Sequence, residues 1–537
     1  MSAFNALKRR YFLHQMGAAA GALLLPPQAS SQPRLNQNPF TLGVASGSPT
    51  ADSLVLWTRL LWPEDEARSD TGPVTVAWEL AHDEQFSRLA QKGTATASAT
   101  WAHSVHVEVD GLEADRWYFY RFRVGEHFSA LGKTRTFPKP EAEVKKLRLA
   151  YASCQKWEDG YFTAWRHMRE ERLDAVMFLG DYIYEYPALS SKIRTPTGGW
   201  VLTLNDYRQR YALYKSDGDL QAMHAACPWL MTWDDHEVQN DYAGVQAGFS
   251  SASEPADPAD FLRRRAAAYQ AYYEHMPLRA SALKRGLAGL IESEKSGTDL
   301  RIYSQVKFGQ LASLYLLDAR QYKDPQVCNK NQTRGSSMVD PALCTSWLDP
   351  QRSLLGPAQE QWLAGEFSKT SATSRAWHVL GQSTLFGQRD FKVGPGQMLW
   401  NDGWDGYAGA RTRLTDSLRK HAVSNPVFLG GDVHENWVGH VKANYADPGS
   451  ASVGVEFCGT SITSRSGGNA KLPERLAENP HFVFADAQRK GYGVVEFTPG
   501  QLTTTLRVVD DVTQKVTRIE TLASFTVQNG RPVVERA

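Results

Sequence analysis

Two side chains with metal-binding chemistry follow one predicted buried strand. The apolar run at residues 175–179 has the length and composition of a buried strand, and Gly180 allows a sharp turn after it. Asp181 comes next, at the strand end where open α/β sheets place their ligands, and Tyr184 follows it closely. A carboxylate and a phenolate suit a hard trivalent ion, and an aspartate in this place can bridge two ions. The alternative is a turn aspartate that caps a helix, next to a core tyrosine.

Other predicted strands end in residues of the same chemical kind. Cys154 follows the strand at 147–153, Asp235 and His236 follow the strand at 229–233, and Asp432 and His434 follow the strand at 425–429. Because a sheet brings its strand ends to a common edge, these side chains can converge although they lie far apart in the sequence. Sulfur, oxygen and imidazole donors together favour a dinuclear site with one redox-capable ion and one ion that prefers oxygen ligands.

Several of these residues also have a purely structural interpretation. Taken alone, Cys154 is typical of an inert buried thiol, and His236 of a histidine at the start of a helix. Asp234 is interpreted as a cap or as support for a ligand, not as a ligand. The segment 318–322, Asp-Ala-Arg-Gln-Tyr, is expected either to support the site or bind phosphate, or to form a packed salt-bridge corner.

The strand ends belong to a predicted α/β domain at residues 146–525, in which apolar strand patterns alternate with longer helical stretches. Helices are expected at 159–168, at 206–214, at 260–276 and after Gly356, and further strands at 312–317 and in the tail from Gly491. The region supplies both the strands that carry the candidate ligands and the helices that cover them.

A smaller β domain is predicted before it, at residues 38–140. Strand patterns at 53–58, 74–79, 103–109 and 117–124 are separated by Gly, Pro and Asp turn signals. Leu112 followed by Tyr118 and Tyr120 is typical of the tyrosine corner of immunoglobulin-like sandwiches. His103 and His106 are interpreted as surface or packing residues, because they fall on opposite faces of one strand.

Residues 1–30 are interpreted as an export signal and not as part of the fold. The pair Arg9 and Arg10 resembles the twin-arginine signal, which carries folded proteins across the bacterial inner membrane. The apolar run at 16–25 is too short to span a bilayer as a mature helix. No other stretch approaches the apolar length of a transmembrane helix. We therefore expect a periplasmic or secreted protein that uses the twin-arginine machinery and has no stable transmembrane anchor.

Charge and cysteine content narrow the expectations further. The net charge of +1 gives no electrostatic basis for binding nucleic acid or an anionic membrane. Cys328 and Cys344 flank a turn-rich loop and are predicted to form a disulfide, as exported proteins allow. Cys227 and Cys458 lie in apolar surroundings and are interpreted as buried free thiols.

The set of motifs resembles the calcineurin-like metallophosphoesterase superfamily, and within it the PhoD-type alkaline phosphatases and the related calcium-dependent phospholipase D. The motifs are Gly43-Val-Ala-Ser-Gly-Ser-Pro49, Leu56-Trp-Thr-Arg59, Ala152-Ser-Cys154, Gly180-Asp-Tyr-Ile-Tyr-Glu185, Trp233-Asp-Asp-His-Glu237, Leu317-Asp-Ala-Arg-Gln-Tyr322 and Gly430-Gly-Asp-Val-His434. The resemblance implies an α/β fold, a metallophosphoesterase-type sandwich of two mixed β-sheets flanked by helices. An immunoglobulin- or fibronectin-like β-sandwich would precede it.

The resemblance also implies a role for each candidate residue. Cys154, Tyr184 and His434 would bind Fe3+, Asp181 would bridge to a second ion, Asp235 and Asp432 would hold that ion, and His236 would act outside the metals as an acid/base or phosphate donor. Carboxylates stand where relatives use nitrogen donors, which favours Ca2+ for the second ion. The resemblance also allows a second Ca2+, to which we assign no ligands.

The implied activity is hydrolysis of phosphate mono- or diesters by a metal-activated hydroxide. A phospholipase D-like phosphodiesterase acting on phospholipid is the alternative within that chemistry. An exported binding module that holds a carbohydrate or a protein, with a catalytically degenerate α/β domain, is the alternative from another class. Metal content and hydrolysis separate the enzyme from the binding module.

Overall fold

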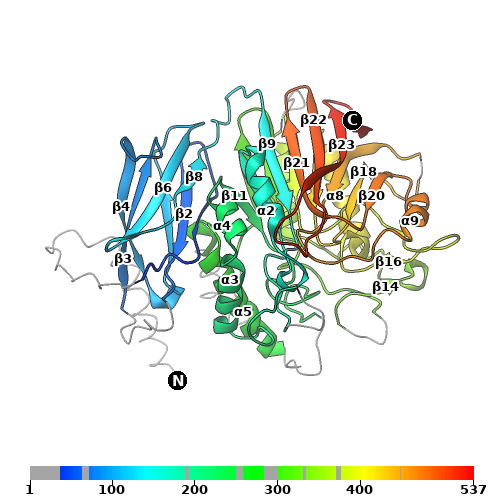
Figure 1. Ribbon diagram of the computed structural model, residues 1–537. Coiled ribbons are helices and arrows are strands. Elements are labelled where there is room, and N and C mark those ends of the chain that lie inside the picture. Colours follow the sequence, from blue (N-terminus) through cyan, green and yellow to red (C-terminus); the bar gives the residue numbers. More distant parts are fainter. Residues whose placement is uncertain are drawn as a thin grey trace, which may run out of the picture.

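The computed structural model describes residues 37–62, 72–187, 193–248, 258–283, 300–329, 334–370, 376–447 and 449–537. The predicted export signal at residues 1–30 lies outside this part of the chain. Among the described residues, no helix is both long enough and apolar enough to cross a membrane. A β domain lies beside a larger α/β domain (Figure 1).

The N-terminal β domain consists of two sheets that share one apolar core. One sheet contains β3 (Val74–Ala81), β4 (Leu89–Ala97), β6 (Trp117–Val124), β7 (His127–Phe128) and β8 (Gly132–Arg135); the other contains β1 (Val44–Gly47), β2 (Leu54–Arg59) and β5 (Ser104–Val109). Leu56 on β2 and Val76 on β3 each contribute a side chain to this core. The predicted strands of this domain are confirmed. The Tyr118 hydroxyl accepts a hydrogen bond from the backbone N–H of Glu113 at 3.0 Å, the contact that a tyrosine corner makes.

The β domain is continuous with the α/β domain, a feature that the sequence pattern did not predict. β1 pairs in parallel with β11 (Trp229–Thr232) at Gly47 and Trp229, so that β1, β2 and β5 extend the first α/β sheet. The approach is close, because a Cβ atom at Gly47 would lie 2.7 Å from the carbonyl oxygen of Pro277. Glycine at this position therefore lets the two domains share one sheet.

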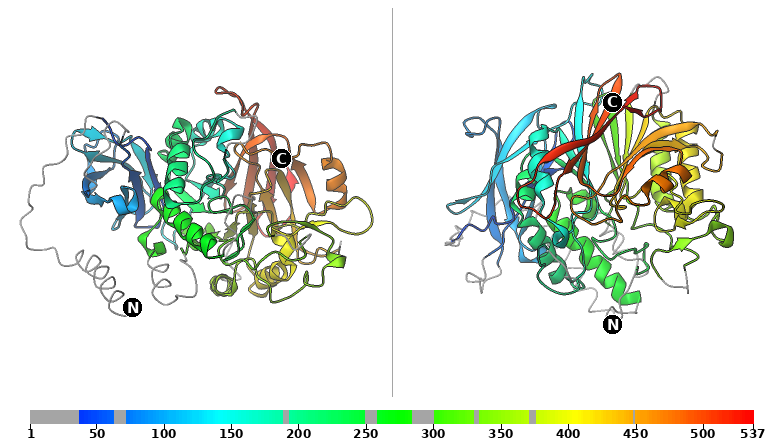
Figure 2. Two further views of the ribbon diagram at one scale, coloured as in Figure 1. Left: turned by 90° about the horizontal axis from the view of Figure 1, so that it is seen from below. Right: turned by 45° about the vertical axis from the view of Figure 1, so that its right-hand side comes forward.

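The α/β domain contains two mixed sheets packed face to face (Figures 1 and 2). The first continues from β11 through β10 (Ala175–Leu179), β9 (Leu147–Ala152), β21 (Lys490–Phe497), β22 (Gln501–Val509), β23 (Ile519–Gln528) and β24 (Glu535–Arg536). The second has the order β12 (Ser304–Phe308), β13 (Ala312–Leu316), β15 (Trp377–Gly381), β17 (Pro426–Gly430), β19 (Ser452–Cys458), β18 (Asn436–Lys442) and β20 (Phe482–Asp486). The apolar core between the two sheets contains Met177 from the first sheet and Leu429 from the second.

Helices cover the outer faces of both sheets, giving four layers. The first sheet packs against α2 (Thr163–Met168), α3 (Leu204–Lys215), α4 (Gly218–His224) and α5 (Pro258–His275), and the second against α7 (Pro357–Ser368) and α8 (Ala408–Lys420). A small two-stranded antiparallel sheet of β14 (Met338–Val339) and β16 (Leu399–Trp400), and helix α9 (Leu472–Glu478), lie at one end. Thr203 begins α3 with a capping box, in which its side chain and that of Asp206 each accept from the other's backbone N–H.

Two predicted boundaries are wrong. The expected helix at 159–168 is shorter, because only α2 is helical and a 3-10 turn at Trp157–Asp159 precedes it. Gly160 separates them in an extended conformation, which ends the turn. The predicted domain end at residue 525 falls inside β23, and the sheet continues to β24. The core strands at 147–153, 175–179, 229–233, 312–317 and 425–429 are confirmed.

The C-terminal end of α5 docks on the β domain. The indole N–H of Trp57 donates to the carbonyl oxygen of Glu274 at 2.9 Å. His106 Nε2 donates to the carbonyl oxygens of Tyr273 at 2.9 Å and Met276 at 3.0 Å, and its ring stacks on Tyr273. The last carbonyls of a helix lack partners within the helix, so these donors satisfy them. His106 is therefore a packing residue, as predicted.

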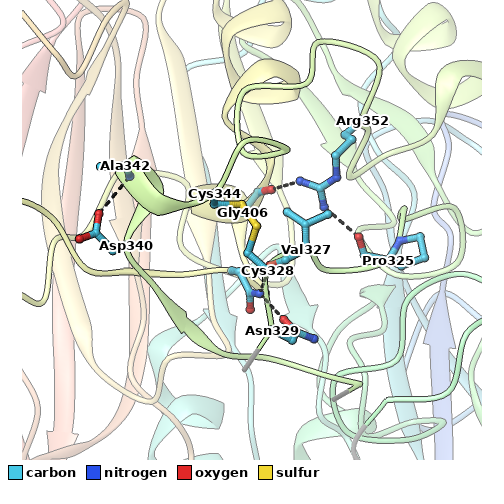
Figure 3. The surroundings of a disulfide bond; sticks show 10 residues. Pro325, Val327, Cys328, Asn329, Asp340, Ala342, Cys344, Arg352 and Gly406 are labelled. Atoms are coloured by element: carbon cyan, nitrogen blue, oxygen red, sulfur yellow. Dashed lines mark hydrogen bonds between the residues drawn. A yellow bond between two sulfur atoms is a disulfide. The ribbon is translucent and has the colours of Figure 1, made fainter. Parts of the chain in front are cut away.

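The predicted disulfide between Cys328 and Cys344 is confirmed, with a Cα–Cα distance of 5.9 Å (Figure 3). It closes a loop that carries Ser336, whose backbone N–H and hydroxyl both donate to the carboxylate of Asp241. Cys227 and Cys458 are buried free thiols, as predicted.

We predict that replacing both disulfide cysteines, Cys328→Ser with Cys344→Ser, lowers the free energy of unfolding. The sequence separation is 16 residues, and closing a loop of that size stabilises a fold by about 3 kcal/mol. Urea denaturation measures the change. Reductant should destabilise the wild type to the same extent and leave the double variant unchanged. A double variant as stable as the wild type would contradict the prediction.

Candidate metal centre

The predicted iron ligands converge at the carboxyl ends of β9, β10 and β17. One donor atom each from Cys154, Asp181 and His434 lie within 4.8 Å of one another. The Tyr184 hydroxyl donates to Asp181 Oδ2 at 2.9 Å and lies 3.2 Å from His434 Nε2. Side chains that are up to 280 positions apart in the sequence thus form one cluster, together with Ser464, whose hydroxyl is 2.7 Å from that of Tyr184.

The backbone turns sharply at each of these strand ends. Cys154, Asp181, Asp432 and His434 all have positive φ angles, of 59°, 58°, 64° and 57°. This left-handed conformation costs a non-glycine residue about 1–3 kcal/mol and is enriched at functional sites. Gly180 has a φ of 105°, and a Cβ atom there would lie 2.6 Å from the backbone nitrogen of Asp234. No other residue fits between the two strand ends.

Asp181 also belongs to a second group of donors. One ligand atom each from Asp181, Asp235 and His236 lie within 4.8 Å of one another. Asp181 is thus the residue common to both clusters. Asp432 is in neither of these clusters; its Oδ2 accepts a hydrogen bond from the Thr384 hydroxyl at 2.8 Å.

The acidic side chains are buried and short of positive charge. Burial raises the pKa of Asp181 well above its usual value, although His236 acts in the opposite direction. Burial and the neighbouring carboxylate of Asp234 do the same to the pKa of Asp432. Oδ1 of Asp181 and Oδ1 of Asp235 are buried without a hydrogen-bond partner. Cations at this place would offset the burial cost, so the residues fit metal binding.

The sulfur and phenol donors also need a nearby positive charge. Burial and the charge of Asp181 raise the pKa of the Cys154 thiol and of the Tyr184 phenol far above their usual values. Both groups therefore stay protonated unless a bound cation stabilises their anions. His434 Nδ1 donates to the carbonyl oxygen of Arg465 at 2.8 Å, so Nε2 is the nitrogen that could accept a cation.

His236 is held by a carboxylate on the side away from the cluster. Its Nδ1 lies 2.7 Å from Glu185 Oε2, and Glu185 Oε1 accepts from the backbone N–H of Asn240 at 2.8 Å. Burial lowers the pKa of His236, but Glu185, Asp181 and Asp235 together outweigh it and raise that pKa well above its usual value. A histidine ordered in this way can hold a proton close to Asp181.

Arg320 is the internal counter-charge of the site. It pairs with Asp234 at 2.5 Å, with Asp402 at 2.6 Å and with Asp235 at 3.5 Å. Lys323 pairs with the other oxygen of Asp402 at 2.5 Å. The segment 318–322 therefore provides a packed salt-bridge corner that supports the site. Asp234 pairs with Arg320 and so supports the site, as the sequence predicted.

Sequence reasoning missed the residues that connect the strand ends. The Glu237 carboxylate accepts from the backbone N–H groups of Asp181 at 3.1 Å, Tyr182 at 2.7 Å and Asp234 at 2.9 Å. Glu185 and Glu237 lie inside the quoted motifs, so the motifs were the available signal. Asp402 and Ser464 lie outside the motifs. One ligand atom each from Asp235, Asp241 and Asp402 form a third acidic cluster within 4.8 Å.

Comparisons with known proteins agree with this geometry. The model of the PhoD-like phosphatase family matches residues 149–506, and that of the PhoD-like phosphatase N-terminal domain matches residues 27–138. Alkaline phosphatase D of Bacillus subtilis (strain 168) is 41% identical over 541 residues, which covers 98% of this chain and 88% of that relative. A solved structure of PhoD superposes with a TM-score of 0.85 at 41% identity, covering 94% of this chain and 93% of the other. The chain therefore belongs to the PhoD-like phosphatase family of phosphoric ester hydrolases.

Proposed function

We propose that this protein is an exported alkaline phosphatase that hydrolyses phosphate mono- or diesters at a dinuclear Fe3+/Ca2+ centre. The observation that carries the proposal is Asp181, which belongs to two donor clusters and has a buried oxygen without a partner. A carboxylate shared in this way suits a bridge between two ions. The 41% identity to a relative named alkaline phosphatase D supports the activity.

The donor set suggests how the two ions would be distributed. Cys154, Tyr184 and His434 would hold Fe3+, because thiolate, phenolate and imidazole suit a redox-capable ion. Asp235 and Asp432 would hold Ca2+, which prefers carboxylate oxygens. When bound, such a pair of ions supplies hydroxide at neutral pH and stabilises the charge that develops on the phosphoryl oxygens.

The remaining steps fall to side chains of the protein. His236 would protonate the oxygen of the leaving alcohol, with Glu185 holding its Nδ1 at 2.7 Å. Arg320 would keep Asp235 in place through the ion pair at 3.5 Å. Glu237 would hold the loops of Asp181 and Asp234 in register, since it binds the backbone of both.

Export and the type of the N-terminal domain are also proposals. Arg9-Arg10 and the short apolar run at 16–25 support twin-arginine export to the periplasm or the medium. The disulfide is consistent with an oxidising compartment. The contact between Tyr118 and the backbone of Glu113 supports an immunoglobulin-like β domain.

Metal analysis of the purified protein tests the centre. We expect iron and calcium in the wild type, and p-nitrophenyl phosphate hydrolysis that chelation abolishes. Cys154→Ala should lose iron, since the change removes the proposed thiolate ligand. Cys227→Ala, which removes a buried thiol away from the site, should keep its iron. A wild type without iron, or iron retained in full by Cys154→Ala, would refute the assignment.

Asp181→Asn should lower turnover by more than about 100-fold, because an amide cannot bridge two cations. The protein should remain folded, since the change removes a buried charge without changing the side chain's shape. Steady-state kinetics and thermal unfolding measure the two effects. Asp110→Asn, at an exposed turn of the β domain, is the matched control. Near-normal turnover in Asp181→Asn would rule out the bridging role.

His236→Gln should lower kcat according to the leaving group. For glycerol 2-phosphate, whose alkoxide needs a proton, we expect a loss of about 10²–10⁴-fold. For p-nitrophenyl phosphate, whose phenolate leaves unprotonated, we expect about 10-fold or less. Glu185→Gln should show the same pattern more weakly. Equal losses on both substrates would exclude His236 as the general acid.

A further inference from the structure

Lys156 places an ammonium group beside the rings that line the metal centre. Its Nζ lies 5.6 Å from the ring centroid of Tyr184 and 5.5 Å from that of Tyr186. Its backbone is fixed, because its N–H donates to the Ser464 hydroxyl at 3.3 Å and its carbonyl oxygen accepts from Thr463 Oγ1 at 2.7 Å. The side chain itself is half-buried. The ammonium group therefore lies beside two rings of the site, on a residue that is partly exposed to solvent.

The same rings border the proposed proton donor. The imidazole centroid of His236 lies 4.1 Å from that of Tyr184 and 5.1 Å from that of Tyr186. Arg210 on α3 holds this loop, since its guanidinium donates to the carbonyl oxygens of Tyr184 and Tyr186. Lys156 and His236 thus share two aromatic neighbours whose loop is fixed from behind.

Lys156 differs from the other cations around His434, Arg465 and Lys490, because within the described chain its ammonium group forms neither an ion pair nor a hydrogen bond. Arg465 pairs with Asp159 at 3.2 Å, and Lys490 donates to the carbonyl oxygen of His434 at 2.9 Å and to Ser466 Oγ at 2.8 Å. Within the described chain, no ion pair joins Lys156 to a carboxylate. Its charge reaches Glu158, whose pKa burial raises and Lys156 partly lowers, but the two do not form an ion pair.

We propose that Lys156 binds the terminal phosphoryl oxygen that a monoester has and a diester lacks, and so selects phosphate monoesters. This inference rests on the proposed phosphatase activity and deepens it by naming the substrate class. A monoester dianion carries three terminal oxygens, whereas in a diester one of those positions bears the second ester group. An ammonium group also gains more from a dianion than from a monoanion, since Coulomb energy scales with charge.

The inference is tested by comparing Lys156→Met with Lys156→Arg in the purified, metal-loaded protein. Loss of one charge-assisted contact predicts a rise of about tenfold in KM for p-nitrophenyl phosphate. The inhibition constant of inorganic phosphate should rise by about the same factor. For bis(p-nitrophenyl) phosphate, KM should stay within about twofold, because the oxygen that Lys156 would bind carries the second ester group and makes no charge-assisted contact. Lys156→Arg should restore the wild-type values.

Lys420→Met is the matched control, because Lys420 is exposed and ends α8 just before β17, at the opposite edge from Asp432. Metal content and thermal unfolding should be unchanged in every variant. An unchanged phosphate inhibition constant in Lys156→Met would overturn the inference, as would an equal rise in KM for both esters. If the wild type hydrolyses neither ester, the proposed function fails instead, and calorimetric phosphate binding to wild type and Lys156→Met still decides the role of Lys156.

Discussion

The concentration of buried negative charge at the edge of two packed sheets is the constraint on which this structure depends. Asp181 and Asp235 are buried at apolar strand ends and Asp432 is half-buried, and removing such groups from water costs several kcal/mol per ion unless positive charge compensates. Arg320 supplies one fixed positive charge on one side. Oδ1 of Asp181 and Oδ1 of Asp235 remain buried without a hydrogen-bond partner. Bound cations would relieve this imbalance, which links the stability of the site to its chemistry.

The two-sheet core makes such an arrangement tolerable. Four strained left-handed residues at three strand ends cost about 1–3 kcal/mol each and persist only where the surroundings fix them. Of the strands that lead into them, β9 and β10 are buried between the second sheet and the helices α2 to α5, and β17 is buried between the first sheet and the helices α7 and α8. Glu237 connects two of the strand-end loops through backbone hydrogen bonds, so the turns cannot relax independently. Rigid strands thus hold donor atoms at distances that flexible loops would not maintain.

Much of this arrangement was predictable because short apolar runs identify buried strands and the residue after each run lies at the sheet edge. That rule predicted that Cys154, Asp181 and His434 meet at one edge, and the three side chains form one cluster. It failed where local geometry overrides composition, as at Gly160, which divides the expected helix at 159–168. It also could not find Asp402 or Ser464, because they follow no strand motif and reach the site through tertiary packing.

The sequence by itself determined which side chains are the candidates for the chemistry, since the order of strand, turn and possible ligand is local and recurs along the chain. It also determined the two predicted regions, because a β pattern and an α/β pattern differ in period. Only the tertiary structure decided that β1 joins β11 and makes one sheet of the two regions. It alone decided that Asp181 belongs to two clusters and that Lys156 lies beside the ring of Tyr184. Those properties arise from distances between strands that are remote in sequence, and residue types do not specify such distances.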